Sequence, residues 1–376
     1  MINAKTKKYI EDLLKKADVK INGKRDWDIQ VHNELLYNRV LAEGILGLGE
    51  AYMDGWWDCK KLDVFIEKVL SARLDKQVKG SAHVFWSLLW AKINNMQTKV
   101  KAKKVGEQHY DVGNDLYKAM LDKRMVYTCG YWKNAKTLDK AQEDKLDLVC
   151  KKVKLKPGMK VLDIGCGWGS FAKYAAEKYK VKVVGITISK EQVKLAKELC
   201  KGLDVEIRLQ DYRDVDEKFD AIASLGMFEH VGYKNYREYM KVVKKCLKDD
   251  GLFLLHTIAG NTSVVSTNPW LAKYIFPNSM LPSAKQITSA TESLFILQDW
   301  QNFGLDYDKT LMEWYNNFVK AWPKLKKNYN NRFFRMWTYY LLICAGSFRT
   351  NSLAQNQLWQ IVFSKKGLDK VYEGTR

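Results

Sequence analysis

The sequence lacks the long apolar runs and the paired cysteines that mark several common classes of protein. No apolar run approaches the roughly 20 residues that a membrane-spanning helix needs. The N-terminal "MINAKTKKYIEDLLKK" has no apolar core of signal-peptide length. The seven cysteines are odd in number, and none forms a C-x-x-C pair. This pattern argues against a zinc ribbon or a disulfide framework and predicts a protein of the reducing cytoplasm.

Internal repeats, low-complexity segments and the G-x-x-x-x-G-K-[ST] pattern of a P-loop are also missing. What the chain has in excess is positive charge: 63 lysines and arginines against 43 acidic residues give a formal charge of +20. Such a balance favours a polyanionic partner, either nucleic acid or an anionic membrane surface. The sequence has no RNA-recognition motif and no N-P-P-Y-type or paired-cysteine motif, which speaks against nucleic acid.

The 376 residues, 47% of them apolar, suffice for one large domain and a smaller one. Apolar side chains between residues 10 and 17 share one helical face. A second apolar face, around Trp86 and Trp90, fits either a helix packed on its own domain or one lying in a membrane interface. The lysine-rich "KVKAKK" that follows predicts a linker. We therefore expect a small, mostly helical domain over residues 1–100 and a second domain over residues 101–376.

Beyond residue 150, short β-like runs alternate with helical ones. The β-like runs are "MKVLDIG", "VKVVGITIS", "DVEIRLQD", "KFDAIASLG" and "GLFLLHTIAG"; the helical ones include "FAKYAAEKYK", "KEQVKLAKELCK" and "YREYMKVVKKCLKDD". Strands alternating with helices predict an α/β fold, a doubly wound, Rossmann-like parallel sheet covered on both faces. The later runs "SLFILQDWQNFG" and "LWQIVFSKK" are expected to complete the sheet with antiparallel strands.

A glycine-rich turn ends the first of these strands. It contains Gly165, Gly167 and Gly169, with Asp163 just before it. Glycines at such a turn let a ligand approach the backbone closely. Dinucleotide sites also use a glycine-rich turn, but their spacing is G-x-G-x-x-G. The G-x-G-x-G spacing after an aspartate fits S-adenosylmethionine better.

Two further strand ends should lie beside this turn, because ligands of a doubly wound sheet bind at the carboxyl ends of its strands. Thr187 and Ile188 follow the second strand, and Asp211 and Tyr212 follow the third. Most nucleoside-binding sheets of this kind end the second strand in an acidic residue that holds the ribose. Thr187 stands at that place here, and this departure points to a subfamily.

Nine ordered motifs together resemble one enzyme family. They are "YDVGNDLY" (110–117), "YTCGYW" (127–132), "VLDIGCGWGS" (161–170), "GITIS" (185–189), "MFEHVG" (227–232), "LLHTI" (254–258), "IFPN" (275–278), "NFGLDYD" (302–308) and "LWQIVFS" near the C-terminus. The set resembles the cyclopropane-fatty-acyl-phospholipid synthases, a family that includes mycolic acid cyclopropane synthase-like enzymes. The resemblance extends from the N-terminal domain to the last strand and implies a class I S-adenosylmethionine-dependent methyltransferase fold.

The resemblance also implies a reaction. The family transfers a methylene group from S-adenosylmethionine to the cis double bond of an unsaturated acyl chain in a membrane phospholipid. The alkene attacks the sulfonium methyl and leaves a carbocation, and loss of a proton then closes the three-membered ring. Family members use a bound bicarbonate ion as the base.

Site residues follow from the same motifs. The implied bicarbonate ligands are Cys129, Glu229, His256, the Ile258 backbone and Tyr307, and the sequence departs from the family pattern at none of them. The implied cofactor contacts are Tyr110, Thr128, Gly165, Gly167, Thr187, Ile188, Gln192, Asp211 and Tyr212. A metal is not expected, because the site offers too few clustered ligands and a dication would penalise a nearby carbocation.

Physical chemistry supports part of this set. Glu229 and His256 each follow or end a strand, so they can meet on one small anion or one proton. Two close anions repel, so we expect Glu229 or the bicarbonate to share a proton with His256. A capping carboxylate at Glu229 remains an alternative, as does an ordinary buried thiol at Cys129. His230 is interpreted as a packed histidine that helps to position the loop.

Other functions on the same fold remain open. These are a fatty-acyl C-methyltransferase that does not close the ring, a small-molecule N-methyltransferase, and a membrane-binding module without activity. The preferred hypothesis places the protein in the cytoplasm, peripherally bound to the inner face of the membrane through its basic surface. The resemblance also suggests a homodimer.

Overall fold

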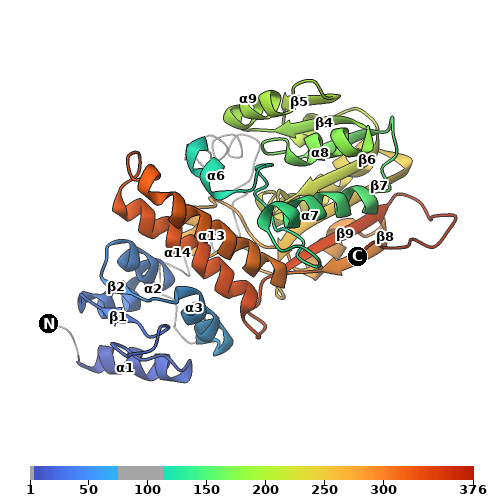
Figure 1. The fold of residues 1–376 in the computed structure, drawn as a ribbon. Coiled ribbons are helices and arrows are strands. Elements are labelled where there is room, and N and C mark those ends of the chain that lie inside the picture. Colours follow the sequence, from blue (N-terminus) through green and yellow to red (C-terminus); the bar gives the residue numbers. More distant parts are fainter. Residues whose placement is uncertain (1–3, 75–112) are drawn as a thin grey trace. The chain divides into compact units, whose positions relative to one another are not determined.

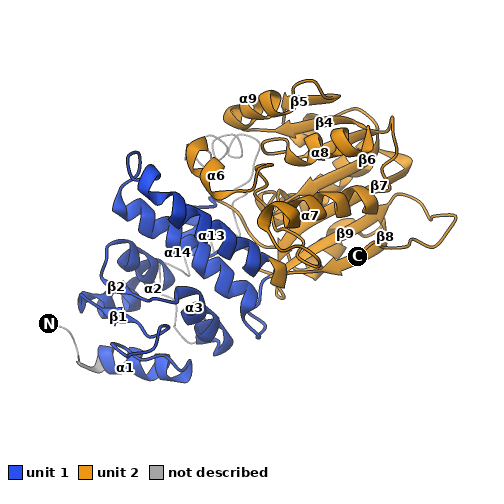
Figure 2. Cartoon of the chain, viewed as in Figure 1, with its two compact units in different colours: residues 1–94, 265–277, 307–356 blue, residues 95–264, 278–306, 357–376 orange. Residues whose placement is uncertain are grey.

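The structure is a computed structural model that describes residues 4–74 and 113–376. Its elements are drawn in Figure 1. The helix around Trp86 and Trp90, the lysine-rich linker and Tyr110 lie outside the described residues. The chain forms two compact units, each built from three segments (Figure 2). Unit 1 comprises residues 1–94, 265–277 and 307–356, and unit 2 comprises residues 95–264, 278–306 and 357–376.

Unit 1 is mostly helical, as expected for the N-terminal part. Its helices are α1 (Ala4–Lys16), α2 (Leu35–Met53), α3 (Leu62–Ser71), α11 (Pro269–Tyr274), α14 (Asn331–Arg349) and α13 (Leu305–Leu325), whose first two residues belong to unit 2. A two-stranded antiparallel ribbon pairs β1 (Gln30–Val31) with β2 (Trp57–Asp58). A division at residue 100 does not describe these units, because two later segments pack with the N-terminal helices.

Close contacts join the first and the last segment of unit 1. A Cβ added at Gly346 of α14 would lie 2.3 Å from the carbonyl oxygen of Asp63 in α3, so only glycine allows this approach. The Arg349 guanidinium binds Asp63 at 2.7 Å and Asp308 at 2.7 Å. These contacts join α3, α13 and α14 into one helical body.

Unit 2 contains the predicted sheet. Its strands are β3 (Lys160–Ile164), β4 (Lys182–Thr187), β5 (Val205–Leu209), β6 (Phe219–Leu225), β7 (Leu247–Ala259), β8 (Ile296–Asn302) and β9 (Gln357–Ser364), in the order β5-β4-β3-β6-β7-β9-β8. The first five are parallel, and β9 pairs antiparallel with both β7 and β8. The predicted doubly wound α/β sheet with antiparallel final strands is therefore confirmed.

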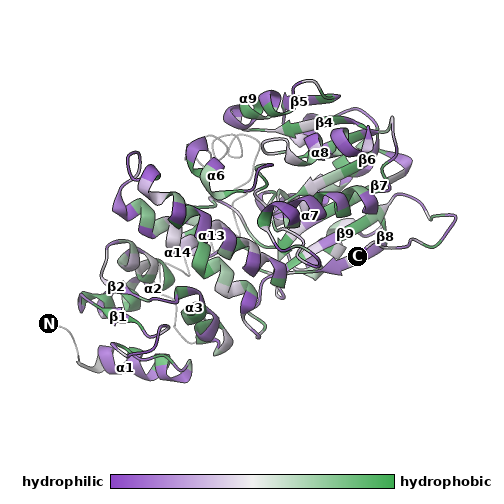
Figure 3. Ribbon diagram, in the orientation of Figure 1, coloured by the Kyte–Doolittle hydropathy of each residue, from purple (hydrophilic) through white to green (hydrophobic). Residues whose placement is uncertain are grey.

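Helices cover both faces of the sheet. They are α7 (Leu138–Lys152), α8 (Ser170–Tyr179), α9 (Lys190–Leu199), α10 (Tyr236–Cys246) and α12 (Ala284–Thr291), and α6 (Asn114–Met120) precedes them. On one face, Leu162 and Ile222 pack with residues of α10 and α12. On the other, Val161 packs with residues of α7 and α8. Figure 3 shows hydrophobic residues along the strands and mixed character along α7, as expected for a helix with one buried side.

Candidate active site

The candidate site lies where the strand order reverses. Sequential connections run outward from β3 through β4 to β5, and the chain then returns to β6 on the other side of β3. Loops that leave β3 and β6 diverge at such a switch point and open a crevice at the carboxyl ends of the strands. Gly165 follows β3 and Gly226 follows β6, so both glycines border this crevice.

The glycine-rich turn has the backbone that its sequence requires. Gly165, Gly167 and Gly169 have φ angles of 80°, 55° and 81°, a region that other residues seldom adopt. The amides of Gly165 and Cys166 both donate to the carbonyl oxygen of Ile186, each at 3.0 Å, which fastens the turn to β4. A Cβ added at Gly167 would meet no atom of the described residues within 4 Å. The space beside Gly167 is therefore open, and this fits a ligand lying against the backbone, as predicted for S-adenosylmethionine.

The residues after β4 form a small buried network. The Thr187 hydroxyl donates to Gln192 Oε1 at 2.7 Å and accepts from the Ser189 amide at 3.3 Å. Ser189 caps α9 by accepting from the Gln192 amide. Thr187, Ser189 and Gln192 are buried, whereas Ile188 between them is half-buried. This network fixes the backbone at the end of β4 and leaves Ile188 the more accessible residue.

Asp211 and Tyr212 follow β5 and are tied to Arg213. The Asp211 carboxylate accepts from the backbone amide of Arg213 at 3.0 Å and from its guanidinium at 3.2 Å. The same guanidinium lies 4.9 Å from the centre of the Tyr212 ring. The predicted contacts at the ends of β3, β4 and β5 therefore line one edge of the sheet.

Glu229 lies in a short 3-10 helix, η3 (Phe228–His230), directly after β6. Its Oε1 accepts from the Ile258 backbone amide at 2.7 Å, and its backbone carbonyl accepts from the Met280 amide at 2.9 Å. Oε2 is buried and has no hydrogen-bond partner among the described residues. Burial raises the pKa of Glu229 to about 7, so the carboxyl group holds a proton readily near neutral pH.

His256 lies on β7, two residues before Ile258. Its ring is 1% exposed, and burial together with Lys145 and Lys152 lowers its pKa well below the usual value. The ring is therefore neutral. The ring Nδ1 lies 3.3 Å from Nε2 of Gln360, and the ring Nε2 has no hydrogen-bond partner in the part of the chain that the structure describes. The structure thus joins Glu229 to Ile258 and sets His256 two residues away on the same strand, each with one unpartnered buried atom.

Thr128 and Cys129 are anchored by α7. Gln142 Nε2 donates to the Thr128 carbonyl at 2.7 Å, and Lys145 Nζ donates to the Thr128 hydroxyl at 2.5 Å. A Cβ added at Gly226 would lie 2.6 Å from the Thr128 methyl group. Cys129 is fully buried, and its thiol donates to the Gly130 carbonyl at 3.1 Å. The segment 128–129 therefore borders the crevice next to the end of β6.

A buried charge cluster underlies this segment. Burial lowers the pKa of Lys145 to about 8 and raises the pKa of Asp163 to about 7. Lys145 opposes the shift at Asp163 because its ammonium favours the nearby carboxylate. Burial likewise raises the pKa of Asp122 to about 6. Of these groups, Lys145 contacts the segment directly, through the Thr128 hydroxyl.

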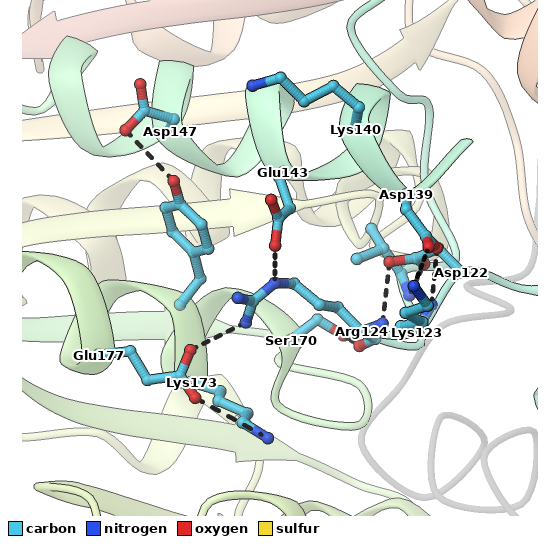
Figure 4. Close-up of polar contacts among 12 residues, drawn as sticks. Asp122, Lys123, Arg124, Asp139, Lys140, Glu143, Asp147, Ser170, Lys173 and Glu177 are labelled. Atoms are coloured by element: carbon cyan, nitrogen blue, oxygen red, sulfur yellow. Dashed lines mark hydrogen bonds and ion pairs between the residues drawn. The ribbon is translucent and has the colours of Figure 1, made fainter. Parts of the chain in front are cut away.

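The loop that leads into this segment is fixed by the polar network drawn in Figure 4. Arg124 binds Glu143 of α7 at 2.9 Å and Glu177 of α8 at 3.0 Å. The Ser170 hydroxyl donates to the Arg124 carbonyl at 2.7 Å, and Asp122 accepts from the Val126 amide at 2.8 Å. Because α7 and α8 hold the loop from two sides, the following residues enter the crevice in a defined position.

Tyr307 belongs to unit 1, near the start of α13. It is 7% exposed, and its ring packs on Phe348 at 4.7 Å between centroids. The other predicted ligands belong to unit 2, and the role of Tyr307 stays a prediction. His230 is half-buried, and burial lowers its pKa to about 4, consistent with its interpretation as a packed, neutral histidine.

Sequence reasoning missed Gln142, Lys145 and Gln360. A signal for the first two exists: Leu138, Gln142, Lys145 and Val149 recur at helical spacing, which sets Gln142 and Lys145 on the buried face of α7. No comparable signal singles out Gln360. Among the described residues, no group of three histidine, cysteine or acidic side chains is placed to hold a metal ion. No helix in the described part of the chain is long and apolar enough to cross a membrane.

Known sequences match most of the chain. The family model for mycolic acid cyclopropane synthetase matches residues 97–360. A cyclopropane-fatty-acyl-phospholipid synthase of Escherichia coli (strain K12) is 53% identical over 354 residues, covering 94% of this chain and 92% of the relative. A probable fatty acid methyltransferase of Mycobacterium tuberculosis is 33% identical, covering 75% of this chain and 68% of the relative.

Solved structures agree in fold. A cyclopropane synthase from Mycobacterium tuberculosis is 28% identical with a TM-score of 0.65, covering 72% of this chain and 100% of that one. A mycolic acid cyclopropane synthase complexed with SAH and CTAB is 29% identical with a TM-score of 0.64, covering 70% and 98%. The unit 2 sheet is thus that of a class I S-adenosylmethionine-dependent methyltransferase, and the chain belongs to the mycolic acid cyclopropane synthetase family.

Proposed function

We propose that this protein transfers a methylene group from S-adenosylmethionine to the cis double bond of an unsaturated fatty acyl chain in a membrane phospholipid, giving a cyclopropane fatty acyl chain. The observation that carries the proposal is a pair of buried atoms, Glu229 Oε2 and His256 Nε2, that have no hydrogen-bond partner among the residues the structure describes. A relative named cyclopropane-fatty-acyl-phospholipid synthase, 53% identical over 94% of the chain, supports the same function.

The cofactor would bind along the edge formed by the ends of β3, β4 and β5. Gly165 and Gly167 would lie against it, and Thr128 would border its reacting end. The remaining proposed contacts are Tyr110, Thr187, Ile188, Gln192, Asp211 and Tyr212. When bound, S-adenosylmethionine supplies the transferred carbon, and bicarbonate supplies the base for the proton that leaves on ring closure.

Glu229 and His256 would hold the bicarbonate through their free atoms. Protonated Glu229 donates a hydrogen bond from Oε2, while its Oε1 accepts a hydrogen bond from the Ile258 backbone amide. Neutral His256 donates from Nε2. Two donors converging on one small anion satisfy groups that would otherwise remain buried without a partner, which is costly. Cys129, the Ile258 backbone and Tyr307 complete the proposed ligand set.

Aromatic rings nearby suit a positively charged intermediate on the acyl chain. The rings of His256 and Phe303 lie 5.9 Å apart, and Phe303 contacts Tyr131 at 5.3 Å between centroids. An aromatic face attracts a cation, and the attraction strengthens where water is excluded. Phe303 and Tyr131 would therefore lower the energy of the carbocation.

The formal charge of +20 would bring the enzyme to anionic phospholipid surfaces as a peripheral, cytoplasmic protein. Each basic residue near such a surface contributes about 1 kcal/mol, and salt screens this attraction. Binding to anionic vesicles in a sedimentation assay should therefore weaken as the salt concentration rises. Binding that is independent of salt would contradict this role for the charge.

The test of the reaction uses purified protein, S-adenosylmethionine and unsaturated phospholipid vesicles, with and without bicarbonate. Fatty esters are analysed by mass spectrometry, and proton NMR of the ring hydrogens separates a cyclopropane from an isomeric, unclosed chain. We expect a cyclopropane product that depends on bicarbonate, falls by about 100-fold or more in Glu229→Gln, and is unchanged in Glu198→Gln, whose side chain is exposed on α9.

Two outcomes would replace the proposal. A methylated but unclosed acyl chain would indicate a fatty acyl C-methyltransferase; the Mycobacterium tuberculosis relative is named a probable fatty acid methyltransferase. Absence of any lipid product despite cofactor binding would favour a small-molecule N-methyltransferase.

A further inference from the structure

Gln360 is the one polar side chain that contacts the Nδ1 side of the His256 ring among the hydrogen bonds of the described residues. It lies on β9 directly opposite His256 on β7. Side chains two positions apart on a strand point to the same face of the sheet. Leu254 is two residues from His256 and Val362 is two residues from Gln360, and both pack against α7 and α8. His256 and Gln360 therefore lie on this same face. Gln360 is fully buried, and its Nε2 lies 3.3 Å from His256 Nδ1.

This contact determines which ring nitrogen carries the proton. An amide NH₂ group only donates, so Nδ1 must accept and cannot bear hydrogen. A neutral imidazole has one N–H, which is therefore on Nε2. The ring is neutral because it is fully buried and because Lys145 and Lys152 of α7, the charged groups that act on it, both oppose a second proton.

The other contact of the ring sets its plane but not its tautomer. Phe303 meets the imidazole at an interplanar angle of 62°, and an aromatic carbon ring offers neither a donor nor a lone pair to Nδ1. Within residues 4–74 and 113–376, the ring Nε2 is buried without a hydrogen-bond partner, as is Oε1 of Gln360. The geometry thus presents a single N–H donor, oriented by Gln360, on the ring edge away from Gln360.

We propose that Gln360 is a positioning residue that fixes His256 as the Nε2-protonated tautomer, so that the ring donates a hydrogen bond to the anion that acts as base. The tautomer rests on the Gln360 amide presenting Nε2, and not Oε1, to the ring, whereas its catalytic consequence depends on the proposed function. Without Gln360, Nδ1 competes for the proton, and a fraction of the rings presents a lone pair to the anion and repels it.

Nitrogen NMR of histidine in the full chain tests the tautomer directly. The chain has five histidines, and the signals of His256 are assigned by their loss in His256→Asn. We expect an unprotonated Nδ1 and a protonated Nε2 in the native protein. A protonated Nδ1 in the native protein would overturn the proposal without the need for any variant.

Gln360→Met removes the donor with little change in volume, and Gln357→Met on the same strand is the matched control. In Gln360→Met we expect both ring nitrogen signals to shift toward a tautomer mixture, and kcat to fall about tenfold or more with the KM for S-adenosylmethionine within about twofold. The control should leave the His256 signals unchanged. Unshifted His256 signals in Gln360→Met would refute the positioning role.

The same measurements separate this inference from the proposed function. A native Nε2–H tautomer that is lost in Gln360→Met, in a protein that makes no cyclopropane, refutes the proposed function and supports the positioning role. Bicarbonate-dependent cyclopropane formation with a tautomer that does not respond to Gln360 refutes the positioning role alone.

Discussion

Glu229 is the residue whose burial has the clearest consequence for stability. Its pKa rises from 4.5 in a free side chain to about 7 in the fold. Below about pH 4.5 the carboxyl group is protonated in both the folded and the unfolded chain, so its burial causes no loss of stability. Between the two values the unfolded chain releases the proton while the folded chain keeps it, so stability falls as pH rises, and the loss is complete above the folded pKa.

Glu229→Gln keeps the shape of the side chain and removes this titration. We expect the variant to gain stability relative to the native protein by about 2–3 kcal/mol between about pH 5 and about pH 8, measured by urea unfolding at both pH values. The exposed Glu198→Gln should show no such pH-dependent gain. A constant difference between Glu229→Gln and the native protein would mean that Glu229 is not protonated in the fold near neutral pH.

Thr128 allows a second test at the residue scale. Its hydroxyl accepts a hydrogen bond from the buried Lys145 ammonium, and its methyl group packs on Gly226. Thr128→Val keeps the packing and leaves Lys145 without that acceptor, which should cost about 1–3 kcal/mol of unfolding free energy and weaken S-adenosylmethionine binding. Thr128→Ser keeps the hydroxyl and should bind the cofactor more tightly than Thr128→Val. Calorimetric titration checks the order, and the reverse order would remove Thr128 from the site.

Individual residues differed in how far the sequence predicted them. The motifs identified Glu229 and His256, and the structure gives each an unpartnered buried atom. Lys145 was missed, although helical spacing places it on the buried face of α7. Gln360 could not be identified, because its importance comes from a partner across a strand pair, and strand pairing is a tertiary property.

At the scale of elements, the alternation of strands and helices predicted the sheet well, but not every boundary. The helix expected over residues 236–250 ends at Cys246, and β7 begins at Leu247. Leu247 pairs with Phe219 of β6 before a register irregularity, and regular pairing resumes at Leu252. Pairing with β6 therefore overrides the helical pattern that the sequence shows up to residue 250.

The glycine-rich turn gives an element-scale prediction with a matched control. Gly167 and Gly202 both have left-handed φ angles, 55° and 82°, and a Cβ at either position would meet no atom of the described residues within 4 Å. Alanine at either should cost a similar backbone strain of about 1–2 kcal/mol. Only Gly167 borders the crevice, so Gly167→Ala should weaken S-adenosylmethionine binding while Gly202→Ala should not. Equal cofactor affinity in both variants would contradict the proposed cofactor site.

At the scale of the whole molecule, the sequence predicted a helical N-terminal part and a sheet-containing remainder. It did not predict that residues 265–277 and 307–356 join the N-terminal helices in unit 1. The apolar faces of α13 and α14 indicate that one side of each helix is buried. Helical periodicity does not predict which other elements pack against that side. Tyr307, predicted as a ligand beside Glu229, consequently belongs to the unit that contains α2 and α3.

Because unit 1 combines N-terminal and later segments of the chain, we expect the two fragments produced by cleavage near residue 100 to stay bound to each other. A protease site inserted there would yield fragments 1–100 and 101–376, and we expect them to co-elute in size-exclusion chromatography after cleavage. The reason is that α2 and α3 supply buried surface for α11 and α14, reinforced by the Arg349–Asp63 ion pair and by Glu50, which binds Lys273 at 2.6 Å.

Gly346→Val tests whether this packing is the cause. Its side chain would collide with the Asp63 carbonyl, so α3 must move away from α14 and the cleaved fragments should separate. Gly367→Val is the control, since a Cβ there meets nothing within 4 Å, and its fragments should remain together. Separation of the cleaved fragments without any substitution would show that residues 101–376 form an independent body, and that the close approach of α14 to α3 adds little to the cohesion of unit 1.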